Sequence, residues 1–441
     1  MTKNKKIFLW LMGGAGALLV VLLVLLLILP KIINIAPVKE KILANVSRTV
    51  GGDVACQQLN LSFLPRPHVE IYQGTLTIPE KITGHVGSLK VYLKIWPLFK
   101  GQFQFTSIRV EAPDFKIGLP EKPEIGKDPQ EQIPFEVMIQ EKVTPLLAQL
   151  LSQAPDLVVT IEEGRLSLTE NQQSEFSFDQ LQARIALSPS SIGIDLACRS
   201  NVFETLTVKG NLGPEDYRGK GQVHLARFRP HLVMNTLISH AGRRVGDSPV
   251  DLDLNFETSG LTRFQAEVTG SVPHLALHQA DQKVVIKGVN LKGDFLRDGD
   301  KTSVVLRQLN LEYPRLQVTG KFEMAELSPR ISLELEGREV DVYSARETAL
   351  ALAGTDRVVQ MIFDILRGGE TPWIIFKTHG DSVKDLGKLD NLFIQGRLNK
   401  GKIGTALFLP GVDADLEDAG GDITISKGML EGENLEARLG N

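Results

Sequence analysis

Histidine is the residue most able to bind a metal, and the sequence has eight, but their spacing does not form a ligand set. His274 and His278 are four residues apart, the separation that places two imidazoles on one face of a helix around zinc. Pro273 and the alternating residues around the pair predict a strand instead, in which the two rings are far apart. The sequence also lacks a His-Glu-x-x-His motif. We therefore expect no metal site.

Motifs for covalent catalysis and nucleotide binding are also missing. No Gly-x-Ser-x-Gly elbow occurs, and the glycines of Gly14-Ala15-Gly16 fall inside a long apolar run. Asp251 and Asp253 are two acids on one face, but they alternate with leucines, a pattern typical of a strand with one face in water. We predict no catalytic residue, no cofactor, and a protein that is not an enzyme.

Charge and cysteine content exclude some further classes. The chain has 49 Lys and Arg against 53 Asp and Glu, a net charge of −4, which gives no basic surface for nucleic acid. Its two cysteines, Cys56 and Cys198, could form one disulfide in an oxidising compartment or remain as two buried free thiols. We expect the free thiols, because an isolated cysteine commonly behaves as a small apolar core residue.

The elements that would position any site begin with an uncharged run at residues 7–29, with Ile7, Leu18 and Leu29 at its start, middle and end. This length crosses a bilayer as a helix. Three lysines in residues 1–6 predict that the N-terminus stays in the cytoplasm and that the rest of the chain lies on the other side. A cleaved signal peptide is the alternative, but its apolar core is only about 7–15 residues long. We expect an uncleaved single-pass anchor.

After the anchor, the chain changes to the alternating pattern of β-strands from residue 54 onward. About twenty short segments alternate in this way and predict a mainly β fold. In one of them the alternation slips at Thr106-Ser107, which indicates a bulge or a new strand. Four dipeptides predict turns. They are Glu163-Gly164, Asp298-Gly299, Lys400-Gly401 and Lys427-Gly428.

Helical spacing interrupts the strands at a few places. The predicted helices are residues 38–50, 135–152 with a bend at Pro145, 228–241, 343–353 and 357–366. A stretch rich in proline and charge, residues 113–134, predicts a linker or long loop.

Several ordered motifs in residues 39–119 resemble the N-terminal region of AsmA-family proteins. A short helix ending in Val50-Gly51-Gly52-Asp53 is followed by strands, by Pro97-Leu98-Phe99-Lys100-Gly101 and by another strand ending at Ala112-Pro113. Residues 420–439 are similar to the C-terminal repeats of the family. The middle of the chain matches only in its pattern of strands.

The resemblance implies an elongated, curled antiparallel β-sheet that forms an apolar groove, with a few flanking helices and an N-terminal transmembrane helix. It divides the chain into a cytoplasmic segment (1–6), the anchor (7–29), an AsmA-like region (37–119), a loop with an amphipathic helix (120–156) and a continuation of the groove (157–441). Because family members are often longer, we expect a short member or a chain truncated at its C-terminal end.

The resemblance also implies a function. It predicts a protein of the Gram-negative inner membrane, with its bulk in the periplasm, that carries phospholipids along the groove and supports the lipid homeostasis of the outer membrane. Its partners would be membrane phospholipids, the inner membrane and proteins of the outer membrane or envelope, with no nucleic acid and no metal. The alternation suggests residues that would line the groove. These candidates are Leu89, Val91, Leu93, Ile95, Leu309 and Leu311.

Other interpretations of the same residues remain open. Alternation of Leu, Ile and Val is also typical of the filled core of a β-sandwich. The protein could be a non-enzymatic scaffold that assists the assembly of outer-membrane proteins, or an envelope adhesin or sensor with closed sandwich domains.

Overall fold

We analysed a computed structural model of the chain. It describes residues 52–62, 66–79, 81–94, 104–118, 139–170, 173–237, 243–279, 282–325, 330–354, 357–405, 414–427 and 429–439, together with residues 40, 44, 47, 97 and 137. The predicted anchor at residues 7–29 and the candidate Ile95 lie outside these residues, as does most of the predicted helix at 38–50. In the part that is described, no helix has the length and apolar character needed to span a membrane.

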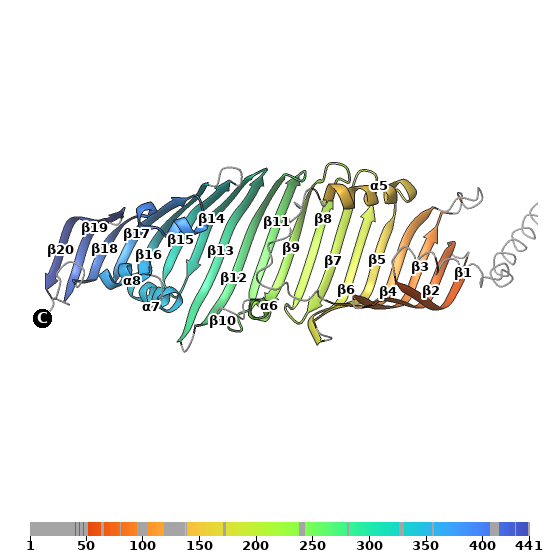
Figure 1. The fold of residues 1–441 in the computed structure, drawn as a ribbon, viewed down its shortest axis with the longest axis horizontal. Coiled ribbons are helices and arrows are strands. Elements are labelled where there is room, and N and C mark those ends of the chain that lie inside the picture. Colours follow the sequence, from red (N-terminus) through yellow and green to blue (C-terminus); the bar gives the residue numbers. More distant parts are fainter. Residues whose placement is uncertain are drawn as a thin grey trace, which may run out of the picture. The chain divides into compact units, whose positions relative to one another are not determined.

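Residues Met1–Asn201 and Asn211–Glu215 form one compact unit, unit 1. Its described strands lie side by side in chain order, from β1 to β7 (Figure 1). The strands are β1 (Asp53–Ser62), β2 (His68–Ile78), β3 (Ile82–Leu93), β4 (Phe105–Gly118), β5 (Val158–Glu170), β6 (Gln173–Leu187) and β7 (Ile192–Ser200).

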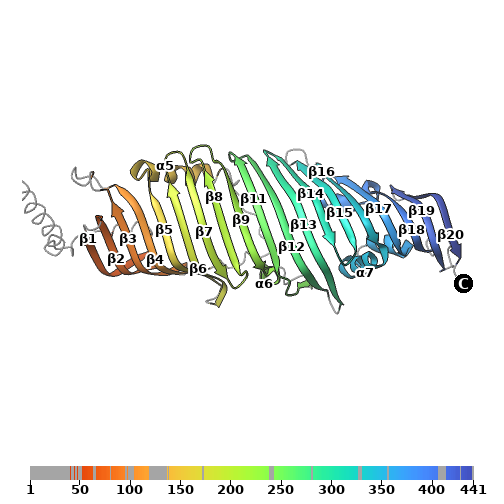
Figure 2. The same cartoon turned by 180° about the vertical axis from the view of Figure 1, so that it is seen from behind.

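Residues Val202–Gly210 and Asp216–Asn441 form the other compact unit, unit 2. Its strands follow one another in chain order from β11 to β20, with β9 on the other side of β11 and β10 extending along the end of β12 (Figure 2). The backbone N–H of Glu204, the residue before β8, donates to the carbonyl of Ala226 in β9, at 3.0 Å.

The strands of unit 2 are β8 (Thr205–Leu212), β9 (Arg218–Phe228), β10 (Arg243–Val245), β11 (Val250–Ser259), β12 (Arg263–Gln279), β13 (Gln282–Asp298), β14 (Lys301–Leu311), β15 (Leu316–Ala325), β16 (Arg330–Asp341), β17 (Leu366–Gly380), β18 (Phe393–Gly404), β19 (Asp415–Ser426) and β20 (Met429–Leu439). The described residues therefore contain twenty strands, which confirms a mainly β fold. His274 and His278 lie in strand β12, as the alternation predicts.

The described helices lie in the predicted segments to within one residue, except for two short 3-10 helices, η2 and η3, which were not predicted. The helices are η1 (Ile139–Val143), a π-helix, α5 (Thr144–Gln153), α6 (Pro230–Leu237), α7 (Val342–Ala353), α8 (Arg357–Ile365), η2 (Val383–Gly387) and η3 (Leu389–Asn391). The helical segment changes type next to the predicted bend, because Pro145 is the second residue of α5 and the π-helix η1 ends two residues before it.

One pair of neighbouring strands departs from the predicted antiparallel sheet. Strand β5 pairs with β4 in parallel, whereas the other pairs with a described register are antiparallel. A parallel pair needs a connection that returns the chain to the same end of the sheet, and the segment containing α5 makes this return. The predicted linker at 113–134 is also corrected in its first part, because Pro113 to Gly118 complete β4.

Fully buried side chains collect where a helix meets one end of the strands. In unit 1, Ala154 and Leu157 follow α5 and pack with Leu187 at the end of β6. In unit 2, Val342 at the start of α7 packs with Leu398 of β18 and Ala419 of β19. Each of these clusters is small and does not extend along the whole sheet.

Both cysteines lie in unit 1 and carry free thiols, as predicted. Cys198 in β7 is buried, and burial raises the pKa of its thiol. Cys56 in β1 is only half-buried, so the expectation of two fully buried thiols holds for one of them.

Candidate functional site

One face of the unit 1 sheet is apolar across all seven strands. Paired residues in neighbouring strands share a face, so the register places side chains in rows that cross the sheet. One row is Leu59, Ile71, Leu89, Val110, Ile161, Ala183 and Leu196. The next is Leu61, Val69, Val91, Ile108, Val159, Ile185 and Ile194.

These rows stop at a line of unusual backbone that runs across the strands, which we call the unit 1 crease. It comprises Gln73 in β2, Ala112 in β4, Glu163 in β5 and Gln180 in β6, which all have positive φ angles near 50°. Their registers align, since Gln73 and Ala112 flank the same residue of β3 and Glu163 lies beside Ala112. A strand residue in this left-handed conformation bends the strand and reverses the alternation of its side chains.

The crease keeps apolar side chains on one face of the sheet. In β2 the half-buried apolar residues are Val69 and Ile71 before the crease but Leu76 and Ile78 after it, a change from odd to even positions. Strand β4 changes in the same way, from Ile108 before Ala112 to Phe115 after it. The predicted slip at Thr106-Ser107 is a separate bulge at the start of β4, where Leu93 pairs with Phe105.

The unit 2 sheet also has an apolar face, which runs from β9 to β20. One row consists of Leu225, Leu252, Gly270, Leu291, Leu309, Val318, Gly337, Ile374, Gly396, Ile423 and Gly432. Glycines alternate with large residues here, and the large side chains lie over the glycine backbone. A Cβ at Gly337 would stand 2.7 Å from Cγ2 of Ile374. The glycine therefore leaves the space that the neighbouring large side chain occupies.

A second line of bends, the unit 2 crease, crosses β16 to β20. It comprises Glu339, Gly369, Lys400, Asp418 and Asn434, one in each strand, and all have positive φ. The predicted turns at Glu163-Gly164 and Lys400-Gly401 are therefore wrong, because both dipeptides lie at a crease inside a strand. The other two turns exist. Asp298 pairs with Lys301 around Gly299, and Ser426 pairs with Met429.

The apolar faces are only partly covered. All the described strands belong to the sheet that carries this face, and no second sheet of described strands lies over it. Leu89, Val91, Leu309 and Leu311 are half-buried. Ile194 in unit 1 and Val304 in unit 2 each keep 38% of their surface exposed, although both lie on the apolar face. In a closed sandwich, most side chains on this face would be buried against a second sheet.

The opposite face is polar and carries ion pairs. In unit 1, Lys90 lies 3.4 Å from Glu70 and 2.8 Å from Glu111. The hydrogen bond to Glu111 raises the pKa of Lys90, and the same contact lowers the pKa of Glu111. In unit 2, Arg397 makes a bidentate contact with Asp422, at 2.8 and 2.7 Å. This face is the one directed toward water.

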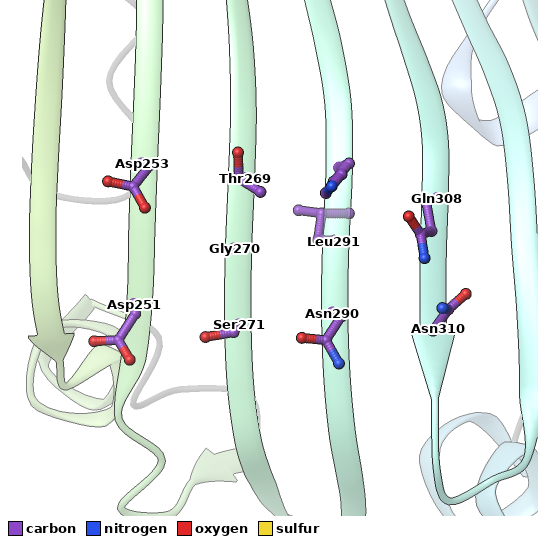
Figure 3. Close-up of a pocket in the computed structure, with 10 residues that line it drawn as sticks. Asp251, Asp253, Thr269, Gly270, Ser271, Asn290, Leu291, Gln308 and Asn310 are labelled. Atoms are coloured by element: carbon purple, nitrogen blue, oxygen red, sulfur yellow. The ribbon is translucent and has the colours of Figure 1, made fainter.

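Four strands of unit 2 show the polar face most clearly (Figure 3). A shallow depression of about 400 Å³ is lined from β11, β12, β13 and β14 by Asp251, Asp253, Thr269, Ser271, Asn290, Lys292, Gln308 and Asn310. Asp251 accepts the N–H of Arg227, and Asp253 lies 2.6 Å from Nδ1 of His224. Both acids are exposed, which confirms the prediction of a strand face in water.

The ion pairs beside the unit 2 crease give a prediction for acid stability. Asp415 accepts hydrogen bonds from Lys402 at 2.8 Å and Arg367 at 2.7 Å, and these contacts lower the pKa of its carboxyl below the ordinary 3.8. A lowered pKa in the folded state stabilises the protein above the pKa of the unfolded state, and this stability is lost as the pH falls through the acidic range. We expect Asp415→Asn to lower the Tm at pH 7 but not near pH 2.

Thermal unfolding of the purified full chain at several pH values measures this effect. Asp300→Asn is the matched control, because it removes the same charge from a turn residue for which no ion pair is present in the described part of the chain. Equal Tm differences at pH 7 and pH 2 would contradict the prediction.

The predicted lining residues fall into two groups. Leu89, Val91 and Leu93 lie on the apolar face of β3, where Leu93 is buried against Phe105. Leu309 and Leu311 lie on the apolar face of β14 and pair with residues of β15. The prediction did not include the two creases. The change between odd and even apolar positions in each strand is the signal that could have revealed them.

A scan against protein-family models matches residues 1–237 to the AsmA family. The chain belongs to the AsmA family. This match confirms the resemblance found in residues 39–119 and extends it through unit 1 to the end of α6. No curated protein matches the chain in a sequence search.

In this AsmA-family chain, residues 238–441 lie beyond the matched region but continue the same construction. The apolar rows, the opposing polar face and a crease of positive-φ residues recur there in β11 to β20. What recurs in both units is an apolar surface that is bent and only half covered. We take this surface, which we call the apolar trough, as the candidate functional site.

Proposed function

We propose that the protein carries phospholipids along its apolar trough and thereby supports lipid homeostasis of the outer membrane. The observation that carries this proposal is the incomplete burial of the apolar face, on which Leu89, Val91, Leu309 and Leu311 are half-buried and Ile194 and Val304 are each 38% exposed. Exposing apolar area to water is unfavourable, so a surface kept open along many strands favours an apolar occupant.

The energetics of lipid movement explain why such a surface is useful. A phospholipid exposes about 30 CH₂ groups when it leaves a bilayer, and each costs about 0.8 kcal/mol, so free passage through water costs on the order of 25 kcal/mol. A surface that covers the acyl chains throughout the passage removes most of this barrier. The Leu, Ile and Val side chains of the rows make dispersion contacts without directional demands, which suits chains of different length.

The location forms part of the proposal. The uncharged run at 7–29 would anchor the chain in a bacterial inner membrane, and the lysines before it would keep the N-terminus in the cytoplasm. Both units would then stand in the periplasm. Envelope or outer-membrane proteins that accept the lipid are the expected partners, and no step of this transport requires a catalytic residue.

The first test is the lipid content of the purified protein. We expect the full chain, extracted in detergent and washed extensively, to retain phospholipid that mass spectrometry identifies. Cross-linkers placed at Leu309 in β14 and at Val91 in β3 should capture that lipid, because both positions lie on the apolar face. Cross-linkers at Gln308 and Lys90, their neighbours on the polar face, are the matched controls.

The alternatives give different results in the same experiment. An assembly scaffold would cross-link β-barrel precursors and no lipid. An adhesin or sensor with closed sandwiches would retain no lipid and would have buried central rows, which does not fit the exposure of Ile194 and Val304. A lipid-free protein whose apolar positions capture nothing would overturn the proposal.

A further inference from the structure

A cavity of about 500 Å³ lies in unit 2 between helix α7, the start of β13 and the turn after β14. Helix α7 contacts β12, β13, β16 and β17, and it lies at the lower end of the unit 2 strands in both views (Figures 1 and 2). The cavity is lined by Val284, Val285, Tyr313, Arg346, Glu347, Thr348, Leu350 and Ala351.

The cavity contains a buried hydroxyl group that lacks a partner. Thr348 is only 7% exposed, and its Oγ1 makes no hydrogen bond within the described part of the chain. Buried hydroxyls in proteins are normally hydrogen-bonded, and an exception calls for an explanation such as a bound water or ion. Ser344, one turn earlier on α7, illustrates the usual case, since its hydroxyl donates to the carbonyl of Asp341.

A cation also lines the cavity. Arg346 is half-buried and donates from Nε to the carbonyl of Phe363 at 3.0 Å. An arginine has five N–H donors in a planar fork, and the single bond from Nε fixes the fork while its Nη groups bind no described carboxylate. A fork held in this way suits a phosphate oxygen pair.

An anion lies on the same helix, next in sequence to this cation. Glu347 accepts the Tyr313 hydroxyl at 2.7 Å, and the pKa values of Tyr313 and Tyr343 are both raised by this carboxylate. Adjacent helix residues point in different directions, so Arg346 and Glu347 present separate positive and negative groups. A carboxylate beside tyrosine rings is a typical environment for an ammonium group.

The cavity also has apolar walls. Val284, Val285 and Leu350 line it. Val284 and Val285 belong to β13, the strand that carries Leu291 of the unit 2 apolar row. We expect the acyl chains of a ligand whose charged end lies in the cavity to extend along this strand.

We propose that the α7 cavity binds the headgroup of a zwitterionic aminophospholipid. Arg346 and Thr348 bind the phosphate, and Glu347, held by Tyr313, binds the ammonium group. The inference rests on the proposed function, and it adds a preference for one class of headgroup. An anionic headgroup without an amine would meet the Glu347 carboxylate without compensation.

Binding measurements with soluble short-chain lipids test the inference on the full chain in detergent. The probes are dihexanoyl phosphatidylethanolamine and dihexanoyl phosphatidylglycerol. We expect the wild-type protein to bind the ethanolamine lipid about tenfold more tightly, because it adds one charge-assisted contact. Glu347→Gln should reduce this ratio to about one by weakening only the ethanolamine lipid, whereas Arg346→Gln should weaken both lipids about tenfold.

Further measurements distinguish a lipid from a free headgroup phosphate as the ligand and control for folding. Glycerophosphoethanolamine, which has the headgroup without acyl chains, should bind at least tenfold more weakly, and equal binding would overturn the assignment to a lipid. Arg338→Gln removes an exposed arginine that pairs with Glu336 and should change neither affinity. Because Glu347 is exposed, Glu347→Gln remains informative even where Arg346→Gln does not fold.

The results also separate this inference from the proposed function. A wild-type protein that retains lipid in its trough but shows no preference between the two probes would overturn the headgroup site and leave lipid transport intact. A ratio unchanged by Glu347→Gln would have the same meaning. A protein that binds neither probe and retains no lipid would overturn both.

Discussion

Replacing Leu309 by Glu is expected to reduce the phospholipid retained by the purified protein about tenfold. Leu309 lies in the unit 2 apolar row, opposite Leu291 of β13 and Val318 of β15. A carboxylate at this position would be covered by acyl chains without a partner, and an unpaired buried polar group costs roughly 2–7 kcal/mol. Because 1.4 kcal/mol is already a tenfold change in binding, a large loss should be measurable. The ratio of lipid to protein, determined by mass spectrometry, is the readout.

The matched control for this substitution is Gln308→Glu. Gln308 is the adjacent residue on β14, but it lines the polar depression and is exposed. The control introduces the same carboxylate into the same strand, so effects on folding and on net charge are shared. If both variants retained lipid equally, position 309 would have no role in lipid binding.

Replacing Gly369 by Ala is expected to destabilise unit 2 by about 3 kcal/mol. Gly369 belongs to the unit 2 crease and has a φ of 113°, a conformation that side chains rarely adopt. An added Cβ would stand 2.6 Å from Cα of Gly401 and 3.0 Å from the carbonyl oxygen of Asn399. Both are backbone atoms of β18, so they cannot rotate away. The Tm of the full chain should fall by roughly 6–12 °C.

Gly368→Ala provides the control for the crease. An added Cβ at this neighbouring position would meet only Cβ of Lys402, at an ordinary 3.7 Å, and the backbone needs no positive φ. Its Tm should change by no more than about 2 °C. A similar loss of stability in both variants would show that the strand tolerates no side chain in this region, and would contradict the special role of the positive φ at Gly369.

Local patterns in the sequence predicted the strands and helices well. Alternation of Leu, Ile and Val identifies a half-buried strand directly, as in Leu89, Val91 and Leu93 of β3. The helices α7 and α8 begin and end within one residue of their predicted limits, because an aspartate cap at Asp341 and the apolar spacing mark them in the sequence. The family was also recognisable, since its motifs occur in a fixed order.

Turn signals were less reliable, for a specific physical reason. A residue followed by glycine indicates a place where the backbone can take positive φ, and a hairpin turn and a strand bulge both need this. Gly299 lies in a hairpin, whereas Glu163 and Lys400 bend the middle of a strand. The two cases differ in whether the next strand pairs back across the dipeptide, which depends on residues far away in the sequence.

The parallel pair and the α7 cavity also depend on distant residues. Strand β5 returns beside β4 with the same direction only because of how the segment containing α5 packs on the strand ends. Tyr313 and Glu347 are 34 residues apart in the chain, and no local spacing predicts that their side chains meet. Sequence patterns could therefore indicate the trough but not the cavity beside α7.

Pairing between consecutive strands has a consequence for how such proteins change during evolution. From β13 to β19 each described strand pairs with the strand before it and the strand after it, so removing one hairpin, such as β14 with β15, would bring β13 against β16 in the same antiparallel sense. Stability in arrays of this kind is the sum of neighbouring contacts. Duplication or loss of whole hairpins would thus alter the reach of the protein while leaving its cross-section unchanged.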